Sequence, residues 1–184
     1  MHDADMMMYS PRLVGNQAPT WKMEGVKKED FHSYSLEDYK GKWLVMFFYP
    51  LDFTFVCPTE IKGFNKEIEK FREMNAEVVG VSTDSVHSHK AWIARDFGGE
   101  LNIPLLADMT KEVAYDYGVL LEEEGISLRG TFIIDPEGVT RYAVVSDNNV
   151  GRSVHETLRV LKALQSGDLC PIDWEEGQDT LGKA

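Results

Sequence analysis

Apolar strand patterns and helical patterns alternate in the middle of the chain, and this order constrains the fold more than any other feature. Residues 42–49 are rich in Val, Phe and Tyr and stop at Pro50, which predicts a buried central strand. Apolar residues then recur at helical spacing, which predicts a helix over about 59–74. A strand over 76–82 and a helix over 86–97 follow. This order predicts a parallel α/β sheet.

Shorter elements follow. Residues 104–107 predict a short strand, and residues 111–117 predict a short helix. Two further strand patterns, over 127–134 and 139–146, are separated by the turn sequence Asp-Pro-Glu-Gly. We therefore expect the sheet to end in an antiparallel hairpin.

A last amphipathic helix is predicted near the C-terminus. Ser153 and Glu156 have the spacing of a capping box at its start, and Asn149 is the alternative cap. The chain has 184 residues, of which 43% are hydrophobic, so it suits one ordinary domain. We expect this domain to cover residues 1–165 and a polar tail to cover residues 166–184.

The net charge of the chain limits the classes of partner that it can bind. The formal net charge is -12, from 31 acidic and 19 basic residues, which argues against a nucleic acid or an anionic membrane as partner. The longest apolar run, residues 43–49, is too short to span a bilayer. The first residues, Met-His-Asp-Ala-Asp, carry acids where a secretory signal would carry lysines. We therefore expect a cytoplasmic protein.

The chain has two cysteines, Cys57 and Cys170. Two are too few for a disulfide scaffold, and neither C-x-x-C nor a Cys/His zinc spacing occurs. Composition alone leaves buried, inert thiols as one interpretation. Cys57, however, lies where a strand pattern gives way to a helical pattern. The unpaired N–H groups and positive dipole end of a helix stabilise a thiolate, which favours a reactive cysteine there.

The residues around Cys57 carry a more specific signal. Residues 49–60, Tyr-Pro-Leu-Asp-Phe-Thr-Phe-Val-Cys-Pro-Thr-Glu, resemble the active-site signature of the typical two-cysteine peroxiredoxins, which include alkyl hydroperoxide reductase peroxidase subunits and thioredoxin peroxidases. Further matches cover nearly the whole chain: Pro104–Asp108, Arg129–Asp135, Gly151-Arg152 and Cys170–Trp174. The resemblance implies an α/β, thioredoxin-like fold with a mixed central sheet flanked by helices, and a C-terminal tail that carries a resolving cysteine.

The same resemblance implies a thiol-dependent peroxidase that reduces hydrogen peroxide and alkyl hydroperoxides. Cys57 would attack one peroxide oxygen and become a sulfenic acid. Arg129 would contact the sulfur and the substrate, Thr54 would hydrogen-bond the thiolate or peroxide, and Pro50 would keep water from the sulfur. No metal, haem or flavin is implied as a cofactor.

Glu60 and Arg152 are implied as supporting residues. Glu60 stands where a thioredoxin has the second cysteine of its C-x-x-C motif, and a lone carboxylate there would disfavour a thiolate at Cys57. Its family counterpart pairs with a second arginine. Arg152 matches that arginine, and an ion pair between the two would remove the objection.

Cys170 is implied as the resolving cysteine. It would condense with the sulfenic acid on Cys57 of the other subunit of a homodimer, after both segments unwind locally. Thioredoxin or a flavoprotein disulfide reductase would then reduce the disulfide. The family's dimers often assemble into rings of five, which are decamers. A holdase chaperone or redox relay is the alternative function, and it is compatible with the peroxidase as a second activity.

Two departures from the family pattern bear on over-oxidation. Easily over-oxidised members carry a Gly-Gly-Leu-Gly loop and a C-terminal Tyr-Phe pair. This chain has Gly98-Gly99-Glu100-Leu101 at the loop, and neither Tyr nor Phe follows Cys170. We therefore expect easy local unwinding, so that disulfide formation outruns further oxidation of Cys57 to sulfinic acid.

Simpler interpretations compete with these roles. Arg129 suits a surface ion pair, and Thr54 suits a helix N-cap. A cysteine hydrolase would need a histidine beside Cys57, but none of the five histidines lies near a matching motif.

The remaining histidines and aromatic residues have structural interpretations. His87 and His89 could suggest a metal site together with Asp84, but residues two apart do not share a helix face, and we expect solvated side chains. Other large aromatic residues are expected in the core and at an interface: Trp43, Trp92 and the phenylalanines at 47, 48, 53 and 55.

Overall fold

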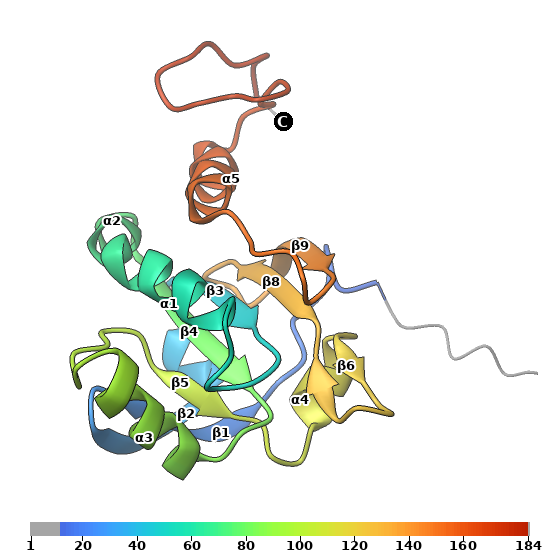
Figure 1. The fold of residues 1–184 in the computed structure, drawn as a ribbon. Helices are drawn as coiled ribbons and strands as arrows, with labels where there is room; N and C mark the ends of the chain where they lie inside the picture. Colours follow the sequence, from blue (N-terminus) through green and yellow to red (C-terminus); the bar gives the residue numbers. More distant parts are fainter. Residues whose placement is uncertain (1–11, 184) are drawn as a thin grey trace, which may run out of the picture.

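A computed structural model describes residues 12–183 of the chain, and a seven-stranded sheet is its centre (Figure 1). The strand order is β2-β1-β5-β4-β3-β8-β9. Three neighbouring strands run parallel: β3 (Trp43–Phe48), β4 (Ala76–Ser82) and β5 (Leu105–Ala107). The other strands of the sheet pair antiparallel: β1 (Lys22–Lys27), β2 (Asp30–Ser35), β8 (Arg129–Ile134) and β9 (Thr140–Ser146). The strands β6 (Leu120–Leu121) and β7 (Ile126–Ser127) form a separate small ribbon.

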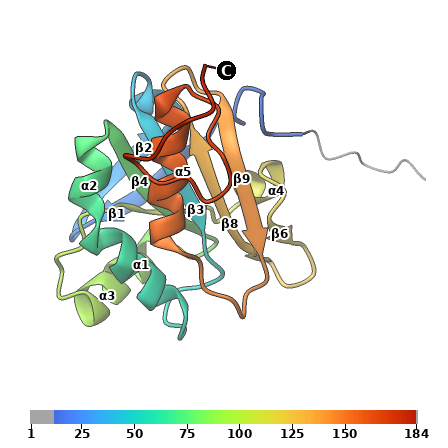
Figure 2. The ribbon, with the colours of Figure 1, turned by 90° about the horizontal axis from the view of Figure 1, so that it is seen from above.

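Helices cover both faces of the sheet. They are η1 (Leu36–Tyr39), α1 (Cys57–Lys66), α2 (Ile68–Glu73), α3 (Val86–Asp96), α4 (Glu112–Asp116) and α5 (Val154–Ser166). Strand β3 shows why two layers are needed, since its alternate side chains enter different apolar clusters. Val45 and Phe47 pack with residues of α1, α2, α3 and α5, whereas Leu44 and Met46 pack with residues of α4. Figure 2 shows α1, α2 and α5 together over one face of the sheet.

The predicted α/β class and mixed sheet are confirmed. The strand predicted over 76–82 matches β4, and the predicted antiparallel hairpin is formed by β8 and β9. The helix predicted over 86–97 matches α3 to within one residue at its end. These elements have long, regular apolar patterns, which carry the strongest signal in a sequence.

The single helix predicted over 59–74 is wrong. The structure has two helices, α1 and α2, which meet at Glu67, where the backbone leaves helical geometry (φ -97, ψ 6). Ile61 and Ile68 lie on either side of the break and both are buried in the same cluster. The apolar spacing therefore continues across the bend, and neither Gly nor Pro marks it in the sequence.

Smaller differences occur at other boundaries. The strand predicted over 127–134 is divided at Leu128 between β7 and β8. The cap of α5 is Ser153, whose hydroxyl oxygen accepts a hydrogen bond from the N–H of Glu156 at 3.1 Å. The alternative cap, Asn149, is therefore wrong.

The β1–β2 hairpin was not predicted. Strand β2 is an edge strand whose first four residues are exposed, so its sequence lacks the alternation of a half-buried strand. The two-residue strands β6 and β7 are too short to leave a pattern.

The segment after α5 folds back on itself beyond the end of that helix (Figure 1). Its Trp174 is buried, and the indole N–H donates to the carbonyl of Gln178 at 3.1 Å. Asp168 forms an ion pair with Lys183 at 2.6 Å and closes the loop. Between residues 12 and 183, no helix combines the length and apolar character needed to cross a membrane.

Candidate active site

Cys57 is the first residue of α1 and is fully buried. Strand β3 ends at Phe48, and the buried Pro50 follows it. Residues 51–56 then form a loop that leads into the helix. The N-cap residue, Val56, makes no side-chain capping bond, so no side chain competes with the sulfur for this positive end of the helix.

Arg129 reaches the sulfur from the first position of β8. Its Nη1 donates to Sγ of Cys57 at 3.4 Å and to Oε2 of Glu60 at 2.6 Å. Its Nε donates to the carbonyl of Asn148 at 2.9 Å. The side chain is buried, so the alternative of a surface ion pair is wrong.

Glu60 and Arg152 form a second buried ion pair beside the first. Nε and the backbone N–H of Arg152 each donate to Oε1 of Glu60 at 2.9 Å. The same guanidinium donates to the carbonyls of Phe48 at 2.5 Å and Gly130 at 2.8 Å, which fixes it against two strands. Burial lowers the pKa of Arg152 below its ordinary value, and the charge of Glu60 opposes that change. The expected pairing of Glu60 with Arg152 is therefore present.

The three ionised side chains leave an excess of one positive charge next to the thiol. Arg129 and Arg152 contribute two positive charges, and Glu60 removes one. Attraction between charges is strong in a buried site, because little water screens it. Ionisation of Cys57 to a thiolate would make the cluster neutral, so the arrangement is suited to hold a nucleophilic sulfur.

Thr54 lies in the loop three residues before Cys57 and is half-buried. Its hydroxyl donates to the carbonyl of Leu51 at 3.0 Å. The hydroxyl oxygen keeps its lone pairs for another donor. The alternative role of Thr54 as the N-cap of α1 is wrong, because the cap position belongs to Val56.

A buried polar network that was not predicted anchors the same loop. His89 was expected to be solvated, but its side chain is 0% exposed. Its Nδ1 lies 2.7 Å from Oδ2 of Asp52, and its Nε2 lies 3.1 Å from the carbonyl of Leu106. Oδ1 of Asp52 accepts from the hydroxyl of Tyr49 at 2.8 Å. His89 occupies the same helical stripe as Trp92, and this spacing was the signal for burial.

The aromatic residues expected in the core and at an interface divide between buried and exposed positions, and the interface stays a prediction. Phe47 and Phe48 are fully buried in β3, and Trp92 is fully buried in α3. Phe53 and Phe55, in contrast, lie in the loop before Cys57 and are 43% and 95% exposed. A loop that crosses the end of a sheet has no layer above it, so these two side chains lie outside the core of the chain.

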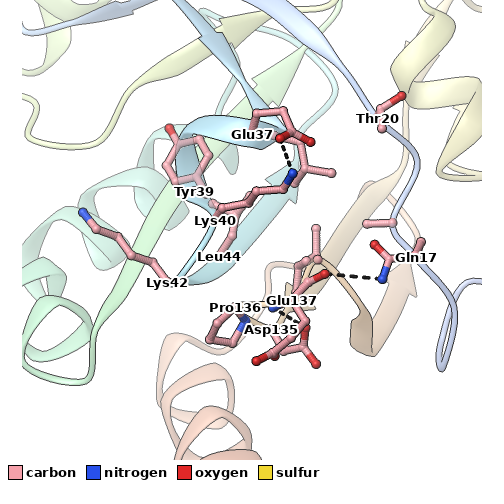
Figure 3. A pocket seen from close by; sticks show the side chains of 14 residues that line it. Gln17, Thr20, Glu37, Tyr39, Lys40, Lys42, Leu44, Asp135, Pro136 and Glu137 are labelled. Carbon is pink, nitrogen blue, oxygen red and sulfur yellow. Dashed lines mark hydrogen bonds and ion pairs between the residues drawn. The ribbon is translucent and has the colours of Figure 1, made fainter.

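A separate cavity of about 290 Å³ lies at the other end of the sheet (Figure 3). Leu44 and Ile134 line it, and they are partners at the start of β3 and the end of β8. Cys57 and Arg129 lie at the opposite ends of these strands. The cavity's Lys40 is paired with Glu37, so its charge is already compensated. In the part of the chain that the structure describes, no group of His, Cys, Asp and Glu side chains is arranged to hold a metal ion.

Cys170 lies far from Cys57. Both cysteines are free thiols. The thiol of Cys170 is half-buried and donates to two carbonyls, that of Ala163 in the last turn of α5 at 3.9 Å and that of Asp168 just after the helix at 3.6 Å. The start of α5 follows Arg152 and therefore lies beside the active site. The 13 residues of α5 span about 20 Å at about 1.5 Å per residue, so the helix separates the two thiols.

Comparison with known proteins gives consistent matches over most of the chain. Residues 14–143 match the AhpC/TSA family. A peroxiredoxin-type protein from the rubredoxin operon of Clostridium pasteurianum is 60% identical over 176 residues, covering 92% of this chain and 99% of that protein. The mitochondrial thioredoxin-dependent peroxide reductase of Homo sapiens is 52% identical over 176 residues, covering 91% of this chain and 69% of that protein. The crystal structure of the reduced 2-Cys peroxiredoxin of Plasmodium vivax has a TM-score of 0.87 and 39% identity, covering 92% of this chain and 93% of that chain.

Proposed function

Because the chain belongs to the AhpC/TSA family and is a peroxidase of the peroxiredoxin type, we propose that Cys57 is the residue that reduces its hydroperoxide substrates. One observation carries this proposal. The sulfur of Cys57 begins a helix and accepts a hydrogen bond from Arg129, within a buried cluster that has one excess positive charge. Hydrogen peroxide and alkyl hydroperoxides are the proposed substrates.

In the first step the thiolate of Cys57 attacks one peroxide oxygen. The O–O bond breaks, the sulfur is oxidised by two electrons to a sulfenic acid, and the other oxygen leaves as water or an alcohol after it takes up a proton. Arg129 would stabilise the negative charge that develops on the oxygens. Thr54, which already donates to Leu51, would accept a hydrogen bond from the peroxide O–H. The buried ring of Pro50 would exclude water from the sulfur.

In the second step the thiol of Cys170 condenses with the sulfenic acid, releases water and forms a disulfide. A disulfide requires Cα atoms within about 7 Å of each other. The length of α5, about 20 Å, makes this bond impractical within one chain. We therefore assign the resolving thiol to Cys170 of a second subunit.

A homodimer follows from this assignment. Strand β9 supports it, because it is an edge of the sheet with unpaired backbone groups on one side. Val144 and Val145 in this strand are each 44% exposed, so the edge is also apolar. An apolar edge strand is suited to association with a second copy.

A dithiol protein would return the disulfide to two thiols. We propose a thioredoxin, because the human relative is named a thioredoxin-dependent peroxide reductase. A flavoprotein disulfide reductase is the alternative donor. Reduction requires access to Cys170, so we propose that the chain divides into a domain over residues 1–165 and a tail over residues 166–184, and that the tail separates from the domain during each cycle.

The test compares the native chain with Cys57→Ser and Cys170→Ser. With dithiothreitol as reductant, the native chain should consume hydrogen peroxide continuously, and Cys57→Ser should consume none above background. Cys170→Ser should form sulfenic acid on Cys57, detected by dimedone and mass spectrometry. A non-reducing gel should show disulfide-linked dimers of the native chain only. Peroxidase activity in Cys57→Ser would overturn the assignment.

A further inference from the structure

Phe53 has a strained backbone in the loop before Cys57. Its φ is +58, in the left-handed region that non-glycine residues rarely adopt. Such a conformation persists only where neighbouring groups hold it. Two groups of α3 do so here. The ring of Phe53 lies 6.0 Å from the ring of Trp92, and the guanidinium of Arg95 lies 5.1 Å from the centre of the Phe53 ring.

One stripe of α3 faces this loop. Ser88, Trp92 and Arg95 are four and three residues apart, so they lie on one side of the helix. Ser88 donates to Oδ2 of Asp52 at 2.8 Å, which fixes the first part of the loop. Trp92 and Arg95 then hold Phe53. The helix therefore contacts the loop at successive turns.

Asp96 sets the position of Arg95. One carboxylate oxygen accepts from Nε of Arg95 at 2.9 Å, and the other accepts from the indole N–H of Trp92 at 2.6 Å. Asp96 thus ties the exposed arginine to the buried tryptophan. We call Phe53, Trp92, Arg95 and Asp96 the loop latch.

We propose that Arg95 is a positioning residue that keeps residues 51–56 closed over Cys57 and thereby sets the fate of its sulfenic acid. This inference rests on the proposed function. In the closed loop, a second hydroperoxide oxidises the sulfenic acid by two electrons to sulfinic acid, and the second peroxide leaves as water or alcohol. In the open loop, Cys170 of the second subunit condenses with the sulfenic acid and releases water. A stronger latch favours the first outcome.

The expected effect is modest, because the Arg95 side chain is 68% exposed. A cation–π contact at an exposed site changes an equilibrium by about two- to fivefold. Arg95→Ala should therefore shift the closed–open equilibrium toward the open loop by about two- to fivefold. Arg95→Lys keeps the positive charge but loses the planar group, and should give an intermediate shift.

The experiment measures sulfinic acid and disulfide on the full-length native chain after a series of hydrogen peroxide doses, by mass spectrometry. Arg95→Ala should form about two- to fivefold less sulfinic acid per disulfide than the native chain. Lys90→Ala is the matched control. Lys90 lies on the same helix and makes the same kind of contact, with its Nζ 5.0 Å from the centre of the Phe31 ring, away from the loop. Lys90→Ala should leave the ratio of sulfinic acid to disulfide unchanged. The urea unfolding midpoints of the native chain, Arg95→Ala and Lys90→Ala should match.

Three outcomes would contradict the inference, and they are distinguishable. If dimedone labels Cys57 in every chain but the ratio is the same in Arg95→Ala and the native chain, the latch is wrong while the proposed function stands. If dimedone labels Cys57 in none of them, the proposed function fails and the latch fails with it. A ratio that changes equally in Lys90→Ala would also contradict a specific role for Arg95.

Discussion

At the scale of single residues, Glu60 has the most consequences, because one carboxylate holds two arginines. It accepts from Arg129 on one oxygen and from Arg152 on the other. Without it, two buried guanidinium groups would repel each other next to the sulfur. With it, a single excess positive charge remains. A lone carboxylate at this position would disfavour a thiolate, but here the carboxylate of Glu60 allows two arginines to be buried beside the sulfur.

The first prediction concerns Arg152. Its guanidinium is buried and donates to Glu60 and to the carbonyls of Phe48 and Gly130. Arg152→Ala would leave these acceptors unpaired, and removing one partner of a buried ion pair costs about 3–5 kcal/mol. We expect the free energy of unfolding to fall by about this amount in urea denaturation followed by tryptophan fluorescence.

Lys70→Ala is the matched control for that experiment. Lys70 forms an ion pair with Glu67 on the surface, where its side chain is 65% exposed. Surface ion pairs contribute about 0–1 kcal/mol, so its unfolding free energy should change little. Equal losses of unfolding free energy in the two variants would show that the buried ion pairs stabilise the fold no more than a surface ion pair does.

The sequence indicated these site residues unevenly. Cys57 could be located from the strand-to-helix junction, and Arg129 only through a family signature, because 72 residues separate it from the sulfur. His89 was misjudged, since histidine is usually placed at the surface and its burial depends on Asp52 and Leu106, which are distant in sequence. The helical spacing of His89 and Trp92 could have indicated burial, but the partners of His89 are distant in the sequence, and periodicity does not record which residues they are.

At the scale of elements, α5 and the segment after it determine how the second thiol is reached. Cys170 is held at the end of α5 by bonds to backbone carbonyls. The buried Trp174 secures the segment, and Arg159 of α5 donates to the Trp174 carbonyl at 3.1 Å. Helix α5 was predictable because its apolar stripe is regular. The fold of the tail was not, because a single tryptophan and a few polar contacts leave no repeating pattern.

The second prediction concerns this tail. Trp174→Ala removes its one buried aromatic anchor, and large-to-Ala changes at buried sites cost about 3–5 kcal/mol. Because the cost falls on a peripheral segment, we expect local release rather than global unfolding. The Cys170 thiol should react with a neutral maleimide at least about tenfold faster than in the native chain. The protein is first reduced, the reductant is then removed, and the labelling rate is measured.

Ile172→Ala provides the comparison within the same segment. Ile172 is 91% exposed, so its removal should leave the Cys170 labelling rate as in the native chain. The labelling rate of Cys57 should be unchanged in both variants, since α1 lies at the other end of α5. Unaltered Cys170 labelling in Trp174→Ala would show that the tryptophan does not hold the tail.

At the scale of the whole molecule, the candidate active site lies at one end of the sheet and a separate cavity lies at the other end. Cys57 and Arg129 lie where β3 ends and β8 begins, and the separate cavity lies at the opposite ends of the same strands. The order of helices and strands made the parallel centre of this sheet predictable. Its antiparallel β1–β2 edge was not, because the exposed β2 lacks the alternation of a half-buried strand and the pairing of β1 with β5 joins residues about 80 apart in the sequence.

The third prediction concerns the β9 edge. The double change Val144→Glu and Val145→Glu places two acids on the exposed edge strand, and like charges facing each other across a dimer oppose association. We expect sedimentation velocity to show a shift from dimer toward monomer, with loss of the disulfide-linked dimer on a non-reducing gel. Cys57 should still form sulfenic acid.

Val150→Glu is the control for charge alone. Val150 is 55% exposed and lies in the loop after β9, outside the sheet edge. It should keep the sedimentation coefficient of the native chain. If the double variant remains dimeric, the proposal that β9 forms the dimer contact is wrong.

The placement of the two thiols at opposite ends of α5 has a consequence for how the protein responds to its own abundance. A solitary chain could reduce one peroxide and would then keep its sulfenic acid, because its own Cys170 cannot reach it. Turnover per chain would therefore fall on dilution and rise with protein concentration. At low protein concentration each chain would reduce one peroxide and stop, whereas at high concentration the paired chains would turn over repeatedly.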